Sequence, residues 1–279
     1  MFTDSFPAIY HPQVNRAKIL LSAGLDKEAV CEASELPSGK GKPGQDLSKA
    51  LFYYSAGSWL KAVQLFGNLP RSYRKNLGYG VERLLFPIKY EQYVNQYSKK
   101  ASVDEAFIFS VIRQESVFNP SAYSVAGARG LMQLMTKTAQ LEARRLKRSY
   151  VSRSQKKQLM KKVRRKNNLY DSETNIILGI HYLKNLLKRY DSVPLALAAY
   201  NAGPTVVGRW RKKISYQDPF YFIEMIPYNE TRDYVKLILR NYFYYKKWYS
   251  PGGSSFPQLE SMTHSLQSLA RRDEIKKSL

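Results

Sequence analysis

Apolar residues recur along this chain at the three- and four-residue spacing of an α-helix, and the alternation typical of β-strands is scarce. The clearest segments are 173–190, 193–202 and 229–248, each of which is expected to be one helix. Gly203 follows the second of these directly, at a position where helices commonly end. The pattern therefore predicts an all-α protein.

The first part of the chain shows paired helical segments. The stretch LSKALFYYSAGSWLKAVQLFGNLP (47–70) predicts two amphipathic helices, one on either side of Gly57, as in an α-solenoid unit. About one and a half such units are visible, so the region is interpreted as the end of a longer helical array. Pro87 interrupts the connector RLLFPIKY (83–90). We expect a superhelical-type region at 1–82, a second domain at 83–249, and a linker and tail at 250–279 with a weak helix at 257–270.

One acidic residue stands on an apolar helix face in the second domain. Ser102 and Glu105 form an S-x-x-E capping box, which predicts a helix starting at Val103 and ending before Pro120. Apolar residues lie seven, four and three positions before Glu115, so the carboxylate is expected on the buried side. An apolar setting disfavours the charged form and raises the pKa of a carboxyl group. Such a group can donate a proton to a leaving oxygen.

A lone acid poses a chemical question. Most glycosidases use two carboxylates, about 5–5.5 Å or 6.5–9.5 Å apart, but after Glu115 no Asp or Glu occurs before Glu142. A one-acid route needs a substrate that supplies its own nucleophile, such as a sugar hydroxyl or an N-acetyl oxygen. A structural interpretation stays open too, in which Glu115 pairs with an arginine or lies in water at the helix end.

Charge is the strongest compositional feature. The 279 residues include 45 Lys and Arg against 22 Asp and Glu, a net charge of +23, which favours polyanionic partners. The segment 137–166 alone holds 13 basic residues and one acid, Glu142, and so carries more than half of the excess. This distribution indicates a local basic patch or a mobile basic arm.

Other composition narrows the classes of site. Cys31 is a single cysteine, and the three histidines are far apart in sequence, so neither an intramolecular disulfide nor a metal site is expected, and no cofactor is predicted. No apolar run approaches 18 residues, and the first residues show no secretory signal.

Three further motifs have plain structural interpretations when taken singly. GARGLMQLM (127–135) could place methionines in a core, ALAAYNAGP (196–204) could be a helix end, and IPYNETRDYV (226–235) a solvated helix start. In combination they are more specific. Together, RQESVFNPSAYSVAGARGLMQLM, DSETNIILGIHYLKNLL, LALAAYNAGP and FIEMIPYNETRDYV resemble, in order and spacing, the soluble lytic transglycosylase family, whose domain is related to goose-type lysozyme.

The resemblance covers about residues 86–248 and implies a lysozyme-like helical catalytic domain preceded by a short α-superhelical region. It also implies that Glu115 acts as acid and then base on the bond between N-acetylmuramic acid and N-acetylglucosamine in peptidoglycan. The substrate's C6 hydroxyl would attack C1 and form a 1,6-anhydro sugar. Tyr234 would hold Glu115, and Ser116 would support the helix end. The residues that would bind the glycan are Ser124, Gln133, Met135, Tyr200 and Asn201. Glu230 and Arg232 are interpreted as structural.

The implied setting is the periplasm or cell envelope, with peptidoglycan strands as partner and a monomeric protein. The chain departs from the family pattern at Met135-Thr136, where Met-Pro is usual, and in the segment 141–169, which is longer and more basic. Alternatives stay open: a muramidase that hydrolyses the same bond, a non-catalytic murein binder, or a nucleic-acid or polyanion binder acting through residues 137–166. Tyr150 is the one aromatic residue in that segment, so specific nucleic-acid binding is not expected, whereas an anionic polymer or membrane surface would suit it.

Overall fold

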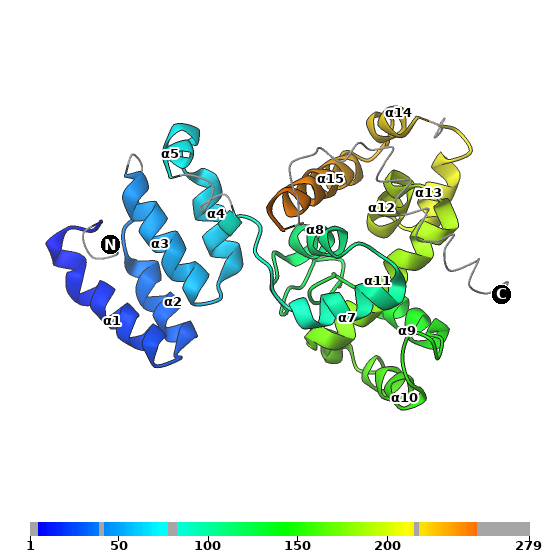
Figure 1. Ribbon diagram of the computed structural model, residues 1–279, viewed down its shortest axis with the longest axis horizontal. Coiled ribbons are helices and arrows are strands. Elements are labelled where there is room, and N and C mark those ends of the chain that lie inside the picture. The colour runs from blue at the N-terminus through cyan, green and yellow to red at the C-terminus, as the bar shows by residue number, and fades with distance from the viewer. Residues whose placement is uncertain (1–4, 39–41, 78–82, 215–217, 250–279) are drawn as a thin grey trace. The chain divides into compact units, whose positions relative to one another are not determined.

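The computed structural model describes residues 5–38, 42–77, 83–214 and 218–249, apart from the side chains of residues 166 and 167. Regular structure in these ranges is helical (Figure 1), apart from two isolated bridges that join Arg129 to Tyr123 and to Leu134. No helix in the described part of the chain is long and apolar enough to cross a membrane. The predicted tail at 250–279, with its weak helix, lies outside the described residues.

The chain divides into two compact units. Unit 1 comprises Met1–Pro87 and Val117–Asn119, and unit 2 comprises Ile88–Ser116 and Pro120–Leu279. The helices of unit 1 are η1 (Ala8–Tyr10), α1 (His11–Ser22), α2 (Asp26–Glu35), α3 (Pro43–Ser55), α4 (Trp59–Asn68) and α5 (Arg71–Asn76).

Neighbouring helices of unit 1 pack in pairs, α1 with α2 and α3 with α4. Gly57 has a φ of +69° and forms the turn between α3 and α4, so the two helices predicted around it are confirmed. Phe52 and Phe66 are buried in the shared core. The buried Lys49 ammonium on α3 donates to the carbonyls of Ser34 and Leu36, at 2.8 and 2.5 Å, and so satisfies the end of α2.

Unit 2 contains the remaining helices (Figure 1). They are α7 (Glu91–Ala101), α8 (Glu105–Ser116), α9 (Thr136–Arg145), α10 (Arg153–Lys162), η2 (Lys166–Tyr170), α11 (Ser172–Tyr190), α12 (Val193–Ala202), α13 (Pro204–Trp210), α14 (Pro219–Glu224) and α15 (Asn229–Tyr249). Helix α11 packs against α7, α9 and α12, and α15 packs against α8 and α12. The core of unit 2 therefore forms around α11, α12 and the α8–α15 pair.

The three strongest helix predictions are confirmed by α11, α12 and α15, and Gly203 closes α12 with a φ of +90°. The predicted capping box is wrong. Ser102 ends α7 in a left-handed conformation, with a φ of +54°, and α8 begins only at Glu105. The Asp104 carboxylate accepts the Ala106 N–H at 2.8 Å and takes the capping role, because Ser102 is used to stop the preceding helix.

The basic segment is folded. It forms α9 and α10, and α9 begins at Thr136 directly after Met135. The sequence left two alternatives for this segment, a local basic patch or a mobile basic arm. The two ordered helices agree with the local patch and not with the mobile arm.

Candidate active site

Glu115 lies in the last turn of α8, and Tyr234 lies in the second turn of α15. Packing of these two helices brings the side chains together. The Tyr234 hydroxyl donates to Oε1 of Glu115 at 2.5 Å. The carboxyl group is thus anchored by a neutral donor, and neither an arginine nor a second carboxylate is its hydrogen-bond partner there.

Burial dominates the electrostatics of Glu115. It raises the pKa of this carboxyl to about 8, and the nearby negative charge of Glu230 acts in the same direction, whereas the hydrogen bond from Tyr234 lowers the pKa. Residue Glu115 as a whole is half-buried. Its carboxyl group is protonated at neutral pH, which is the state that a general acid needs.

A second tyrosine, Tyr200, stands near this carboxyl. Burial raises the pKa of Tyr200 well above its usual value, and the charge of Glu115 adds to the effect. The rings of Tyr200 and Tyr182 lie 5.1 Å apart, and Tyr182 contributes in turn to the raised pKa of Tyr234. The phenols of Tyr200 and Tyr234 therefore stay protonated beside Glu115.

The Tyr200 hydroxyl is already engaged, since it donates to the Met132 carbonyl at 2.8 Å. Asn201 is engaged as well, because its Oδ1 accepts the Thr231 hydroxyl at 2.6 Å. These contacts tie α12 to the loop after α8 and to the start of α15. What Tyr200 can offer a ligand is thus its ring face.

Ser116 and the loop that follows α8 fix the end of that helix. The buried Ser116 hydroxyl lies 2.8 Å from the Leu131 carbonyl and 3.2 Å from the Ile112 carbonyl, so it ties the helix end to the loop. Val117 and Phe118 then adopt positive φ values of 47° and 60°. Non-glycine residues rarely do so, and such strain often occurs at functional sites.

Asn175 on α11 organises the loop of residues 129–132. Its fully buried amide donates to the carbonyls of Arg129 and Leu169, both at 2.8 Å, and accepts the Met132 N–H at 2.7 Å. Gly130 has a φ of +78°, and a Cβ there would lie 2.3 Å from the Leu169 carbonyl oxygen. Only glycine therefore fits this position without a backbone shift.

The other expected glycan-binding residues belong to the same loop. Gln133, with a φ of +44°, donates through Nε2 to the carbonyls of Ala122 and Gly130, at 3.1 and 2.9 Å. The Ser124 hydroxyl accepts the Ala128 N–H at 3.0 Å. Met135 precedes α9 and is 44% exposed. Gln133 and Ser124 thus shape the loop, whereas the Met135 side chain is open to a ligand.

Of the residues interpreted as structural, Arg232 donates to the Ile226 carbonyl at 3.2 Å and to the Asn229 side chain at 2.6 Å. Glu230 acts on Glu115 through its charge.

Sequence reasoning did not single out Asn175 or Tyr182. A buried amide on an otherwise apolar face of the segment 173–190 is the signal that could have pointed to Asn175. In the described part of the chain, no three His, Cys, Asp or Glu side chains cluster closely enough to hold a metal ion.

Comparison with known proteins places this site in a family. Residues 92–222 match the family model described as the transglycosylase SLT domain. Residues 92–222 of this chain are therefore an SLT domain. The soluble lytic murein transglycosylase of Escherichia coli strain K12 is 30% identical over 240 residues, which cover 84% of this chain and 34% of that protein. The corresponding protein of Salmonella typhimurium is 29% identical over 239 residues, with the same coverage.

Solved structures of SLT family members share the fold. The 70 kDa soluble lytic transglycosylase of Escherichia coli superposes with a TM-score of 0.65 at 28% identity, covering 91% of this chain and 38% of that one. An inactive mutant of the lytic transglycosylase Slt from Pseudomonas aeruginosa gives a TM-score of 0.63 at 26% identity, covering 83% of this chain and 34% of that one. The expected all-α, lysozyme-like fold is confirmed. The chain spans about a third of the length of the curated relatives it matches.

Proposed function

We propose that this SLT family member is a peptidoglycan lytic transglycosylase that cleaves the β-1,4 bond between N-acetylmuramic acid and N-acetylglucosamine and leaves 1,6-anhydro-muramic ends. The observation that carries the proposal is a partly buried Glu115 with a raised pKa, held by Tyr234 rather than by a carboxylate. The names of its relatives, which are lytic murein transglycosylases, support the same reaction.

In the first step Glu115 acts as the general acid. Because Tyr234 donates to Oε1, the carboxyl proton is carried on Oε2 and is directed at the substrate. That proton passes to the glycosidic oxygen, the bond from C1 to this oxygen breaks, and positive charge develops at the sugar ring. The Glu115 carboxylate that remains stabilises this charge, and the phenol of Tyr234 stabilises the carboxylate.

In the second step Glu115 acts as the base. It takes the proton of the C6 hydroxyl while that oxygen attacks C1 and closes the 1,6-anhydro ring. The proton lost in the first step is thereby restored to Glu115, and no water enters the product. A second carboxylate is unnecessary because the substrate supplies the nucleophile.

The surrounding residues would position the glycan. We assign the exposed Met135 and the Tyr200 ring face to contacts with the sugars, since the Tyr200 hydroxyl is already bonded within the protein. Ser124, Gln133 and Asn201 hold the wall through their own hydrogen bonds and offer their remaining polar atoms to the sugar. Ser116 supports the helix end that carries Glu115. The substrate places the protein in the cell envelope.

The test is digestion of purified murein by the protein and by Glu115→Gln, followed by mass spectrometry of the released muropeptides. The proposal expects anhydro-muropeptides from the unaltered protein and none from the variant. Products one water heavier, with reducing ends, would instead assign a hydrolytic muramidase. Full lytic activity of Glu115→Gln would remove Glu115 from the reaction altogether.

A further inference from the structure

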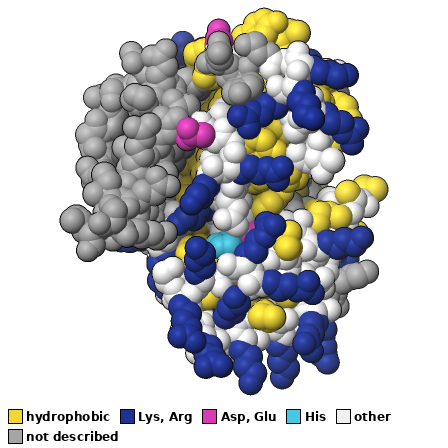
Figure 2. Space-filling view, turned by 90° about the vertical axis from the view of Figure 1, so that its right-hand side faces the viewer, with side chains coloured by type: hydrophobic (Ala, Val, Ile, Leu, Met, Phe, Trp, Pro, Cys, Tyr) yellow, Lys and Arg dark blue, Asp and Glu magenta, His cyan; other side chains and the backbone are white. Residues whose placement is uncertain are grey.

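The α9–α10 hairpin, residues 136–165, exposes many basic side chains and no acidic one. Its exposed charged side chains are Lys137, Arg144, Arg145, Lys147, Arg148, Arg153, Lys157, Lys161, Arg164 and Arg165. Figure 2 shows the side of the molecule that lies on the right in Figure 1. Lys and Arg side chains gather at its lower end, at the level at which α10 lies in Figure 1. The hairpin thus carries +11 of the chain's net charge of +23, close to half of it.

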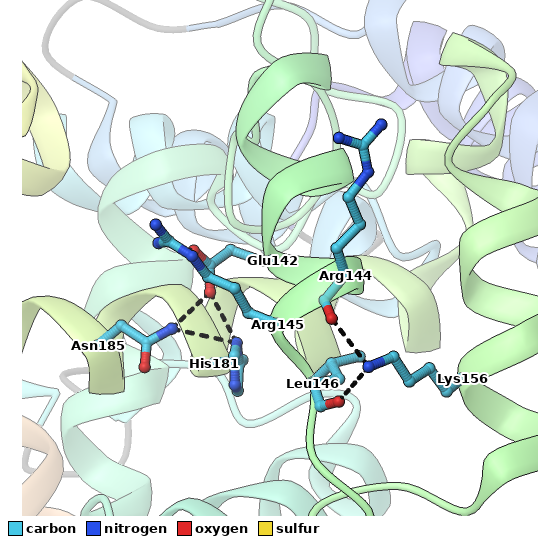
Figure 3. Close-up of polar contacts among 7 residues, drawn as sticks. All are labelled: Glu142, Arg144, Arg145, Leu146, Lys156, His181 and Asn185. Carbon is cyan, nitrogen blue, oxygen red and sulfur yellow. Dashed lines mark hydrogen bonds and ion pairs between the residues drawn. The ribbon is translucent and has the colours of Figure 1, made fainter.

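The one acid of the hairpin faces the core and offsets a single exposed cation, Arg145. Glu142 is fully buried and points from α9 toward α11 (Figure 3). Its carboxylate lies 2.7 Å from Nδ1 of His181, accepts Nδ2 of Asn185 at 2.6 Å, and pairs with Arg145 at 3.1 Å. Glu142 therefore anchors the hairpin to the core of unit 2, and every exposed charge within the hairpin is positive.

Lys156 holds the two helices of the hairpin together. Its ammonium donates to the carbonyls of Arg144 and Leu146, at 2.8 and 2.6 Å, which lie at the end of α9 (Figure 3). Ser152 and Gln155 form a reciprocal capping box at the start of α10. The exposed basic side chains are consequently carried by two helices that are held together by hydrogen bonds.

Helix α10 arranges its cations in a line. Arg153, Lys157 and Lys161 follow one another at four-residue spacing and are all exposed, so their side chains leave the same face at intervals of about 6 Å along the axis. Met160 is 38% exposed and lies beside them. A row of long basic side chains suits the plane of phosphates on an anionic membrane surface.

We propose that the α9–α10 hairpin docks on an anionic phospholipid bilayer. A bilayer presents a dense plane of phosphates that many cations on one protruding hairpin can contact at once, and long Lys and Arg side chains adapt to it without a shaped pocket. A nucleic acid would call for exposed aromatic rings, but Tyr150 is buried, with 5% of its surface accessible. Binding of this kind would hold the SLT domain close to a membrane, whatever reaction the site performs.

The proposal is tested with the whole chain and vesicles of phosphatidylglycerol and phosphatidylcholine. The test variant replaces Arg153, Lys157, Lys161 and Arg164 by Gln. The matched control replaces four exposed lysines of unit 2 outside the hairpin, Lys99, Lys188, Lys212 and Lys213, by Gln, and so loses the same charge. Thermal unfolding of both variants checks that they remain folded.

We expect the unaltered protein to sediment with anionic vesicles and not with phosphatidylcholine alone, and to detach as salt is raised. The hairpin variant should bind anionic vesicles about 100-fold or more weakly, since each basic residue near such a surface contributes about fivefold. The control should stay within about threefold of the unaltered protein if the effect is specific to the hairpin.

Three results would overturn the proposal. They are equal losses in the hairpin variant and the control, undiminished vesicle binding by the hairpin variant, and stronger hairpin-dependent binding to lipid-free murein or to polyadenylate RNA than to vesicles. Cleavage of a short soluble muropeptide is a separate readout. It tests the proposed reaction and is expected to be the same in all three proteins.

Discussion

The Tyr234 hydroxyl lies 2.5 Å from Oε1 of Glu115, although the two residues are 119 positions apart in sequence. Burial and this hydrogen bond act on the carboxyl in opposite directions, and burial prevails, with a resulting pKa of about 8. The tyrosine thus fixes the orientation of the acid without forcing it to ionise. This relationship underlies the first three predictions.

The pH dependence of cleavage should reflect the pKa of Glu115. The general acid must be protonated, so kcat/KM on murein fragments is expected to fall about tenfold per pH unit above a pH of about 8. Initial rates measured from pH 5 to 10 check this. A descending limb near pH 4.5, the usual value for a glutamate, would show that Glu115 is not the acid or is not desolvated.

The Glu115→Gln variant should become more stable than the unaltered protein as the pH rises. Between pH 4.5 and about 8 the folded protein keeps a proton on Glu115 that the unfolded chain has lost, so the free energy of unfolding falls with pH across this window. Glutamine removes that dependence. We expect the variant to match the unaltered protein at pH 4 and to exceed it by about 1–3 kcal/mol at pH 8.5. Urea unfolding at the two pH values measures this, and a pH-independent difference would contradict it.

Replacing Tyr234 by phenylalanine should slow cleavage and shift its pH profile. Without the hydrogen bond, the pKa of Glu115 is expected to rise further, so the basic limb moves to higher pH. Loss of the fixed orientation should lower kcat roughly 10- to 100-fold. Tyr242→Phe is the matched control, because Tyr242 lies two turns further along α15 and donates to Asp104 at 3.1 Å. It should cost about 1 kcal/mol of stability and leave the pH profile unchanged.

Gly130→Ala should destabilise the protein more than the φ angle alone explains. A Cβ at this position would lie 2.3 Å from the Leu169 carbonyl oxygen and 2.4 Å from the Asn175 amide. Gly127→Ala is the control, since Gly127 has a φ of +91° but only the flexible end of Arg129 within 4.0 Å. We expect about 1–2 kcal/mol for Gly127→Ala from backbone strain, and roughly 2 kcal/mol more for Gly130→Ala. Equal effects in denaturant unfolding would refute the steric argument.

Glu142→Ala should loosen the α9–α10 hairpin. The change leaves the buried His181 and the half-buried Asn185 without their acceptor, and the expected loss is about 2–4 kcal/mol. The exposed pair of Glu224 with Lys236 serves as the comparison, and Glu224→Ala should cost less than about 1 kcal/mol. Thermal unfolding gives the ranking, and hydrogen exchange in α9 and α10 should show that the loss is local. Comparable losses in the two variants would mean that Glu142 is not an anchor.

Much of the fold could be predicted from the sequence because helices are local. The periodicity of 173–190 and 229–248 gave the bounds of α11 and α15 to within a residue or so. The predicted start of α8 at Val103 was wrong because Ser102 can serve as the end of one helix or as the start of the next. In the structure it ends α7, the preceding helix.

The hydrogen bonds that complete the candidate site could not be predicted from local sequence patterns, because they join residues that are distant in sequence. Asn175 reaches Arg129 across 46 positions, and Glu142 reaches His181 across 39. Taken alone, none of these residues shows in the sequence which polar group it will contact. Only the packing of α11 against the loop and α9 determines which polar groups meet in the core.

By itself, the sequence determined the helices at 173–190, 193–202 and 229–248, the apolar face that carries Glu115, the concentration of positive charge in residues 137–166 and the motif order of the SLT family. These follow from spacing and composition along the chain. The tertiary structure decided that Glu115 is desolvated beside Tyr234, and that Glu142 is buried beneath a wholly cationic hairpin surface. Both depend on burial and on which helices pack together, and these properties arise only when distant segments meet.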